Sequence, residues 1–235
     1  MDPHTQQIDG PDSDFDSREF YARKASSYDA EMDSPSTRKV RLQVKDLVSR
    51  YSQDGGAVLD FGCGTGGDVA SFLEQGRRVL AYDSSSEMLA QLRSRYREAV
   101  RERTVIPLGG ELTDLYAQLA HFDPIRAVVA NFGVINHLPH LGAFADLVSQ
   151  RLTALQVVVL GVHNPLYLPD MGSRWWWRGL WAGRREGVIL CEGTVVRTRR
   201  YFMRTLIQTL SPLFQLRAAY GLCAPMRLLA FERVA

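Results

Sequence analysis

Hydrophobic positions along the chain change their period several times, and each change predicts the boundary of an element. From Ser17 onward, apolar residues recur at steps of three and four, which predicts a helix that breaks near Pro35. A second helical pattern ends before Asp54-Gly55-Gly56, a stop signal. Residues 1–16 lack such periodicity and are rich in Asp, Pro, Gly and Ser, a composition that predicts a disordered leader.

After residue 56, short apolar runs alternate with helical patterns. The predicted strands are Ala57–Phe61, Arg78–Tyr82, Thr104–Leu108, Ile125–Asn131 and Leu155–Val162. The predicted helices between them are Asp68–Gln75, Ser86–Arg101, Leu112–Leu119 and Leu141–Leu152. Continuously apolar strands that alternate with helices indicate an α/β fold with a parallel sheet covered on both faces.

The alternation of strands and helices ends after the fifth predicted strand. Residues 163–185 contain two prolines and a cluster of tryptophans, Trp175–Trp177 and Trp181. The following segments predict one or two strands over Gly187–Thr198, a helix over Arg199–Leu210, and strands over Phe214–Gly221 and Met226–Val234. The last two strands are separated by a short turn, which predicts a hairpin that closes the sheet.

Composition narrows the class of protein. The chain has 235 residues, 46% hydrophobic and 23% charged, which fits one globular domain over residues 17–235. A net charge of +2 without a compact Lys/Arg run argues against a nucleic-acid partner. The three cysteines lack metal-ligand spacing and predict a reducing interior with no metal site. Since no apolar run reaches membrane-spanning length, we expect a cytoplasmic protein.

A glycine-rich turn follows the first strand, where it would bring backbone N–H groups close to a ligand. Gly62-x-Gly64-x-x-Gly67 fits the spacing of a dinucleotide site, whereas Asp60-x-Gly62-x-Gly64-x-Gly66 fits a site for S-adenosylmethionine (SAM). The carboxylates of Asp60 and Asp68 disfavour a pyrophosphate and suit a ligand with an ammonium and a sulfonium group. SAM is therefore the favoured ligand.

With this turn, the chain resembles the class I SAM-dependent methyltransferases from about Ser17 to its end. The matching motifs are Val58–Gly66 and Val79–Asp83, with less specific matches at Gly110–Leu112 and Asn131–Gly133. The resemblance implies a seven-stranded, mostly parallel sheet of order 3214576 with an antiparallel last strand. It also implies an N-terminal helical lid within residues 17–53 and a substrate-side insertion over residues 163–200.

The resemblance further implies a set of cofactor contacts. Asp60, Gly62 and Gly64 would hold the methionine end of SAM, and Asp83 would accept both ribose hydroxyls. The other implied contacts are Cys63 in the loop, Ser84 and Met88 beside the adenosine, Glu111 and Leu112 beside the adenine, Asn131 and Phe132 under the methionine, and Tyr21 and Tyr28 in the lid. Alternatively, Glu111 is a solvated helix residue, the tyrosines pack in the core, and the Cys63 side chain is only a small buried filler.

Methyl transfer needs an aligned acceptor and, where the acceptor carries a proton, a base. His137 follows the fourth strand, His163 follows the fifth, and Tyr167 lies just beyond, so these are the candidate catalytic residues. The alternative is that the histidines only hydrogen-bond loop backbone. Many members of the family use no base.

The expected acceptor is a small, hydrophobic or aromatic molecule, with O-methylation favoured over C- or N-methylation and S-adenosylhomocysteine (SAH) as the other product. An Asn-Pro-Pro-Tyr motif for methylation of nucleic-acid bases is absent. The tryptophan-rich segment is interpreted first as a pocket or lid, then as a dimer surface, and last as a membrane contact, so the chain is a monomer or a homodimer. Two rival functions remain open: a nicotinamide-dependent oxidoreductase, which the lack of Tyr-x-x-x-Lys disfavours, and a non-catalytic SAM-binding protein.

Overall fold

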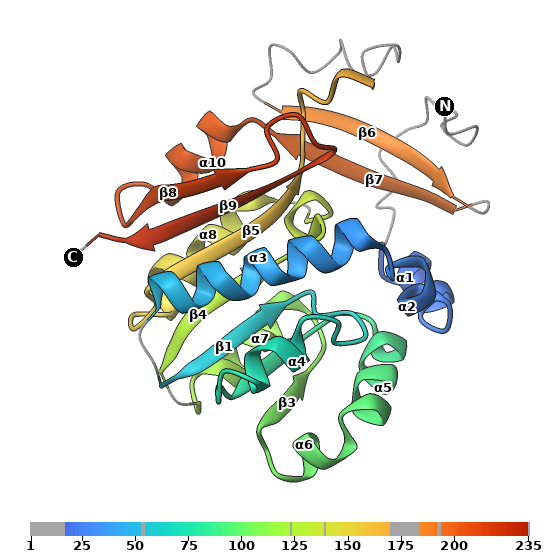
Figure 1. The fold of residues 1–235 in the computed structure, drawn as a ribbon, viewed down its shortest axis with the longest axis vertical. Helices are drawn as coiled ribbons and strands as arrows, with labels where there is room; N and C mark the ends of the chain where they lie inside the picture. Colours follow the sequence, from blue (N-terminus) through green and yellow to red (C-terminus); the bar gives the residue numbers. More distant parts are fainter. Residues whose placement is uncertain are drawn as a thin grey trace.

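The computed structural model describes residues 17–52, 55–122, 124–138, 140–169, 184–191 and 194–234 (Figure 1). The predicted leader over residues 1–16 and the tryptophans of residues 175–181 lie outside the described residues. Within the described ranges, no helix combines the length and the apolar character that crossing a bilayer requires.

Seven strands form one sheet in the order β3-β2-β1-β4-β5-β9-β8. The strands are β1 (Ala57–Phe61), β2 (Val79–Tyr82), β3 (Val105–Leu108), β4 (Ile125–Ala130), β5 (Val157–His163), β8 (Phe214–Tyr220) and β9 (Met226–Arg233). The first five pair in parallel, and β9 lies antiparallel between β5 and β8. The predicted sheet, with its last strand antiparallel, is confirmed.

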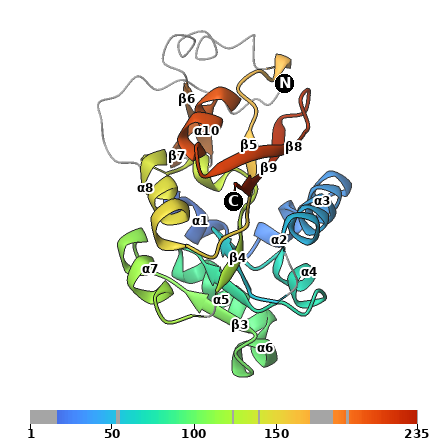
Figure 2. The same cartoon turned by 90° about the vertical axis from the view of Figure 1, so that its left-hand side faces the viewer.

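Helices cover both faces of the sheet (Figure 2). One face carries α3 (Pro35–Tyr51), α4 (Val69–Leu73), α5 (Ser86–Arg95) and α6 (Arg97–Arg101), and the other carries α7 (Leu112–Leu119), α8 (Leu141–Asp146) and α10 (Met203–Leu210). The short helices α1 (Ser17–Lys24), α2 (Tyr28–Glu31) and η1 (Val134–Asn136) lie at one end of the sheet, and a π-helical turn, η2 (Leu147–Arg151), extends α8.

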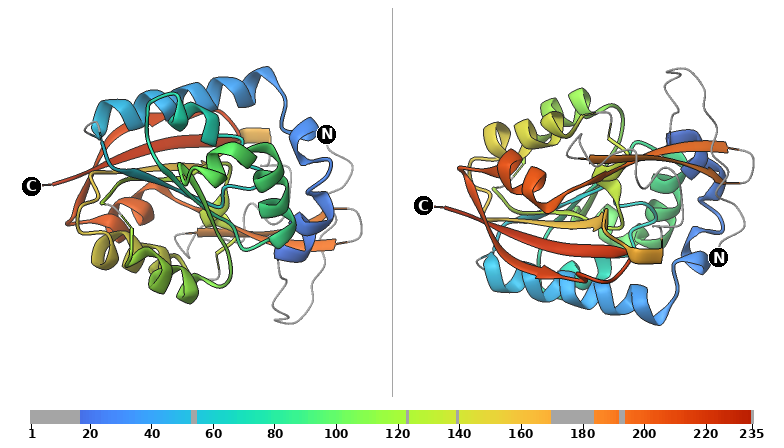
Figure 3. Two further views of the ribbon diagram at one scale, coloured as in Figure 1. Left: turned by 90° about the horizontal axis from the view of Figure 1, so that it is seen from below. Right: turned by 90° about the horizontal axis from the view of Figure 1, so that it is seen from above.

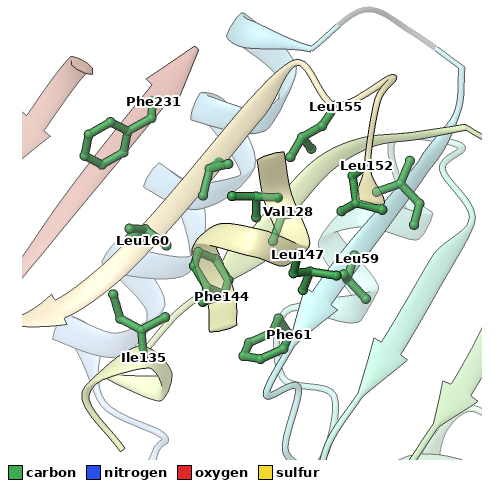
Figure 4. Close-up of a cluster of buried hydrophobic side chains, with 14 of the residues drawn as sticks. Leu59, Phe61, Val128, Ile135, Phe144, Leu147, Leu152, Leu155, Leu160 and Phe231 are labelled. Atoms are coloured by element: carbon green, nitrogen blue, oxygen red, sulfur yellow. The ribbon is translucent and has the colours of Figure 1, made fainter. Parts of the chain in front are cut away.

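Side chains of each strand alternate between two cores, as the two-sided sheet requires. Leu59, Phe61, Val128 and Leu160 pack with Phe144 of α8 on one face (Figure 4). The intervening strand residues pack against α3 and α4 on the other face. This burial on both faces explains why the strands read as continuous apolar runs.

Several predicted helices differ from the observed ones. The helix expected from Ser17 to near Pro35 is divided into α1 and α2, and the one expected over Leu141–Leu152 becomes π-helical after Asp146. The helix expected over Ser86–Arg101 breaks at Tyr96, whose hydroxyl donates to the Gly66 carbonyl at 2.8 Å and so holds the end of α5 against the glycine turn. The helix expected over Arg199–Leu210 begins only at Met203. Residues 199–201 instead continue a strand, because they pair with a partner strand that precedes them in the chain.

The segment between β5 and α10 contains an antiparallel hairpin, β6 (Arg184–Cys191) and β7 (Thr194–Tyr201), that forms a separate two-stranded sheet. Strand β7 packs against α1, η1 and β5. Figure 3 shows α1 and this hairpin at the same end of the molecule, opposite the C-terminus. The hairpin and the N-terminal helices therefore enclose the end of the sheet where β1, β4 and β5 finish.

Candidate functional site

The glycine turn leaves β1 in a backbone conformation that excludes side chains. Gly62 has a φ of +75°, and an added Cβ would come within 2.4 Å of Val134 Cγ1. Gly64 has a φ of +54°, and its missing Cβ would lie 3.5 Å from the ring of Tyr28. Backbone conformation therefore favours glycine at both positions, and at Gly62 the lack of space excludes a side chain as well. The turn presents bare backbone next to Tyr28 of α2.

Asp83, directly after β2, is bound to this turn. Its Oδ2 accepts from the Gly64 N–H at 2.8 Å, and its Oδ1 accepts from the Ser85 N–H at 2.9 Å. Burial raises the pKa of Asp83, while these two N–H groups lower it. An ionised carboxylate has about four lone-pair sites, so each oxygen can accept one further hydrogen bond. The position suits a ligand with two adjacent hydroxyl groups.

A buried polar cluster lies beside the turn, at the ends of β1 and β4. Asn131 Nδ2 donates to Asp68 Oδ2 at 3.0 Å, and Arg41 Nη1 of α3 lies 3.6 Å from Asp68 Oδ1. Asp60 is 3% exposed, and its Oδ2 has no hydrogen-bond partner. Burial, followed by the neighbouring Asp68, raises the pKa of Asp60, and burial also raises the pKa of Asp68. A buried carboxylate oxygen without a donor fits a ligand that brings an N–H group.

Phe132, after β4, has a φ of +52°, an unusual conformation for a bulky residue. The Asn131 side chain holds it, because Oδ1 accepts from the Phe132 N–H at 2.9 Å. The Arg41 guanidinium lies 5.1 Å from the centre of the Phe132 ring. Strain of this kind is characteristic of functional sites, where surrounding contacts maintain it.

The N-terminal helices bring two tyrosines to the site. The rings of Tyr21 and Tyr28 pack edge to face at 6.2 Å, and Tyr28 is the one over the glycine turn. Burial, followed by the proximity of Tyr21, raises the pKa of Tyr28, so its phenol stays protonated. Asp29 accepts from the hydroxyl of Thr65 in the turn and from Arg95 of α5. These contacts hold the two helices over the carboxyl ends of the strands.

The structure brings the two candidate histidines together. The rings of His137, after η1, and His163, at the end of β5, meet edge to face at 6.3 Å. The Tyr21 hydroxyl lies 3.3 Å from His137 Nε2. Burial, then His137, then Arg200 lower the pKa of His163 from 6.5 to about 3. His163 is therefore neutral at ordinary pH.

The other predicted residues fall in less central places. Cys63 is 8% exposed, and burial raises the pKa of its thiol. Met88 is buried with its Sδ 4.0 Å from the missing Gly64 Cβ, whereas Ser84 is only half-buried.

Glu111 forms an ion pair with Arg18 of α1, and the half-buried Leu112 packs on the core. Tyr167 lies in the turn after β5, and its backbone N–H donates to the Asn164 carbonyl at 3.4 Å.

Sequence reasoning missed several residues of the site. Arg41 lies three positions before the buried Val44 and seven before Val48, so a basic residue on the buried face of a helix was the available signal. Asn136 is fully buried, and its Oδ1 accepts from the His163 N–H at 3.0 Å. The role of Asn136 depends on tertiary contacts, which no local sequence motif indicates. Among the described residues, His, Cys, Asp and Glu side chains form no group of three that could hold a metal ion.

Comparisons with known proteins bear on the identity of this domain. A family model described as a methyltransferase domain matches residues 58–153, which run from β1 to the end of η2. No curated protein matches the chain in sequence.

The fold is similar to solved methyltransferase structures. A SAM-dependent methyltransferase from Mesorhizobium loti is 20% identical, with a TM-score of 0.59 over 80% of this chain and 96% of that chain. The 1,6-didemethyltoxoflavin N1-methyltransferase from Burkholderia thailandensis, solved with 1,6-didemethyltoxoflavin and SAH bound, is 17% identical, with a TM-score of 0.58 over 97% of this chain and 94% of that chain. The glycopeptide N-methyltransferase MtfA, solved with SAH, is 17% identical, with a TM-score of 0.54 over 86% and 98% of the two chains.

Sequence identities this low establish only the fold. The family model shows in addition that the segment containing the glycine turn belongs to a methyltransferase domain. The buried Asp60 oxygen, the Asp83 carboxylate and the bare backbone at Gly62 and Gly64 also fit the ammonium, the ribose and the methionine chain of SAM. The chain therefore carries a class I SAM-dependent methyltransferase domain, an enzyme domain that takes a methyl group from SAM and leaves SAH.

Proposed function

We propose that the chain methylates an oxygen or nitrogen atom of a small hydrophobic or aromatic molecule, and that His137 accepts the proton that this atom loses. The observation that carries the proposal is a row of rings that runs from the glycine turn to the end of β5. In this row Tyr28 contacts Tyr21, Tyr21 contacts His137, and His137 contacts His163.

The row supports an aromatic or apolar acceptor, because rings pack favourably against other rings and exclude water from between them. Phe20, which packs against Tyr21 at 5.1 Å, adds to the same surface. Two of the similar structures are titled as N-methyltransferases, one for 1,6-didemethyltoxoflavin and one for a glycopeptide. Nitrogen therefore stands beside oxygen as the acceptor atom.

For the cofactor, we assign Asp83 to the ribose, Asp60 to the ammonium, and the backbone of Gly62 and Gly64 to the methionine chain. When bound there, SAM supplies a methyl group on a positively charged sulfur. The chain's own residues then have to orient the acceptor, exclude water and remove one proton. Tyr21 and Tyr28 serve the first two purposes by covering the site.

Proton removal is assigned to His137 for an electrostatic reason. With a pKa of about 3, His163 is too weak a base to hold a proton at neutral pH. The neutral His163 ring instead supports the position of His137. A base is needed only for acceptors that carry a proton on the methylated atom.

The first test compares ligands. We expect SAH to raise the melting temperature of the protein, and NAD⁺ and NADP⁺ to leave it unchanged. The reverse result would favour an oxidoreductase. Transfer of a labelled methyl group to a panel of phenols and nitrogen heteroaromatics then separates an enzyme from a non-catalytic SAM-binding protein.

The second test concerns the base. His137→Gln should lower kcat about 100-fold or more on an acceptor that loses a proton, while the Kd for SAH stays within about twofold. His121→Gln, at an exposed position just after α7, is the matched control and should behave as wild type. Full turnover by His137→Gln would remove His137 from the mechanism.

A further inference from the structure

Two sets of polar contacts fasten the lid, defined here as α1 and α2, to the rest of the domain. On α2, the Asp29 carboxylate accepts from the buried Thr65 hydroxyl and from Arg95 Nη1 at 3.1 Å. On α1, Arg18 pairs with Glu111 at the start of α7. Each contact joins the lid to an element that borders the cofactor side of the site. These contacts hold α1 and α2 against the glycine turn, α5 and the start of α7.

Tyr21 lies on α1 between these two fastenings. Its ring meets Tyr28 at 6.2 Å on one side and His137 at 5.8 Å on the other. Tyr28 in turn covers the glycine turn, whose missing Gly64 Cβ would lie 3.5 Å from its ring. The Tyr21 phenol thus stands between the cofactor side of the site and His137.

The His137 side of this contact is anchored independently of the lid. The His137 N–H donates to the Val134 carbonyl at 3.1 Å. The preceding Asn136 side chain joins the His163 N–H, at 3.0 Å, to the Arg199 carbonyl of β7. The His137 backbone therefore belongs to the fixed body of the domain, while Tyr21 belongs to the lid. Their contact, with Oη 3.3 Å from Nε2, forms across the boundary between the two.

We propose that Tyr21 is a catalytic proton relay carried by the lid: its hydroxyl donates to His137 Nε2 when the lid is closed, and it receives the proton of the acceptor as it passes its own to His137. The relay rests on the proposed function, because it requires a proton-losing acceptor and His137 as the final base. The step is balanced. The acceptor O–H or N–H bond breaks and a new Tyr21 O–H bond forms, while the original Tyr21 O–H bond breaks and a His137 Nε2–H bond forms.

The neighbours of the pair are compatible with this direction of transfer. His163, on the far side of His137, is neutral and adds no positive charge next to the imidazolium that forms. Burial raises the pKa of Tyr28, which therefore stays a neutral phenol beside the pair. Opening of the lid would separate Tyr21 from His137 and disconnect the base, so that proton removal would occur only over an enclosed cofactor.

The test reads the tautomer of His137 by side-chain ¹⁵N NMR, with and without SAH, and so does not depend on turnover. A Tyr21 hydroxyl that donates to Nε2 places the imidazole proton on Nδ1. In Tyr21→Phe the ring remains and the hydroxyl is lost, so we expect the His137 signals to shift toward the Nε2–H form. With a proton-losing acceptor, kcat should fall about tenfold or more while the Kd for SAH stays within about twofold.

A second variant leaves Tyr21 in place and tests the lid. Asp29→Asn weakens the fastening to Thr65 and Arg95, and should move the His137 signals in the same direction as Tyr21→Phe, but less far. Asp33→Asn is the matched control, because Asp33 pairs with Arg38 away from the site, and should leave the signals unchanged. Unchanged signals in Tyr21→Phe would overturn the relay, and unchanged signals in Asp29→Asn would overturn its control by the lid.

The outcomes also separate the relay from its alternatives. If Tyr21 only covers the cofactor, Tyr21→Phe or Tyr21→Leu weakens SAH binding and leaves the His137 tautomer as in wild type, which contradicts the relay. Full turnover by His137→Gln contradicts the proposed base and the relay together. A shifted tautomer in Tyr21→Phe with normal turnover by that variant contradicts the relay and leaves the proposed base intact.

Discussion

Gly64 and Asp83 are joined by a hydrogen bond of 2.8 Å from the backbone N–H of the glycine turn to the carboxylate after β2. The bond links the ends of two parallel strands and fixes the carboxylate before any ligand arrives. A prearranged acceptor loses little conformational freedom on binding, so this contact contributes to affinity without touching the ligand.

Replacement of Asp83 by Asn should weaken SAH binding by about 30-fold, or about 2 kcal/mol. The amide exchanges one acceptor oxygen for a donor group, so either the Gly64 or the Ser85 N–H faces a donor, and one ribose hydroxyl loses its acceptor. Isothermal titration calorimetry measures the change. Glu87→Gln, an exposed carboxyl in the next helix, is the control, and equal affinity in both variants would refute the role of Asp83.

Replacement of Arg41 by Gln should destabilise the fold by about 2–4 kcal/mol at pH 7, because it leaves buried carboxylates without their cation. Arg41 lowers the pKa values of Asp60 and Asp68, which burial holds above their usual range. Without Arg41 these values rise further, so the folded state binds more protons than the unfolded state over a wider pH range. The loss of stability should therefore be larger at pH 8 than at pH 5.

Urea unfolding at the two pH values measures this difference. Lys45→Gln, one turn along α3, removes only an exposed pair with Glu74 and should change stability by less than about 1 kcal/mol at both pH values. A loss in Arg41→Gln that does not grow with pH would contradict the electrostatic account.

Gly62→Ala should destabilise the domain by about 2 kcal/mol or more and abolish measurable SAH binding. The methyl group would be forced within 2.4 Å of Val134 Cγ1 at a φ of +75°. Gly76→Ala separates the two causes, since Gly76 has a φ of +68° with nothing within 4 Å of the added Cβ. This control should cost only about 1 kcal/mol of backbone strain, and thermal unfolding compares the pair.

His163 should make the protein less stable in mild acid. Its folded pKa of about 3 lies below its ordinary value of 6.5, so between these values the unfolded state binds more protons. Its contribution to stability is complete above pH 6.5 and is lost as pH falls toward 3. Relative to wild type, His163→Asn should regain on the order of 2 kcal/mol between pH 6.5 and pH 4.5. Parallel stability curves for the two proteins would show that the imidazole is not desolvated.

Local signals in the sequence were sufficient for most of the elements and for the class of fold. The strand at Ala57–Phe61, the glycine turn and Asp83 follow from apolar runs, backbone conformation and the placement of charge at strand ends. The resemblance supplied the order of the sheet, which the structure confirms. Where prediction erred, as at Arg199–Tyr201, a pairing partner decided between helix and strand.

The sequence by itself determined the class of fold, the cofactor and the position of the glycine turn, because these depend on residues close together in the chain. Only the tertiary structure brought Tyr21 to His137, across 116 positions, and placed Arg41 of α3 against Asp68. Such contacts depend on which helix face meets which strand end, and many residues of the same type satisfy the local pattern equally well. Gly64 and Asp83 were each predicted from the sequence as cofactor contacts, whereas the hydrogen bond between them is a result of folding.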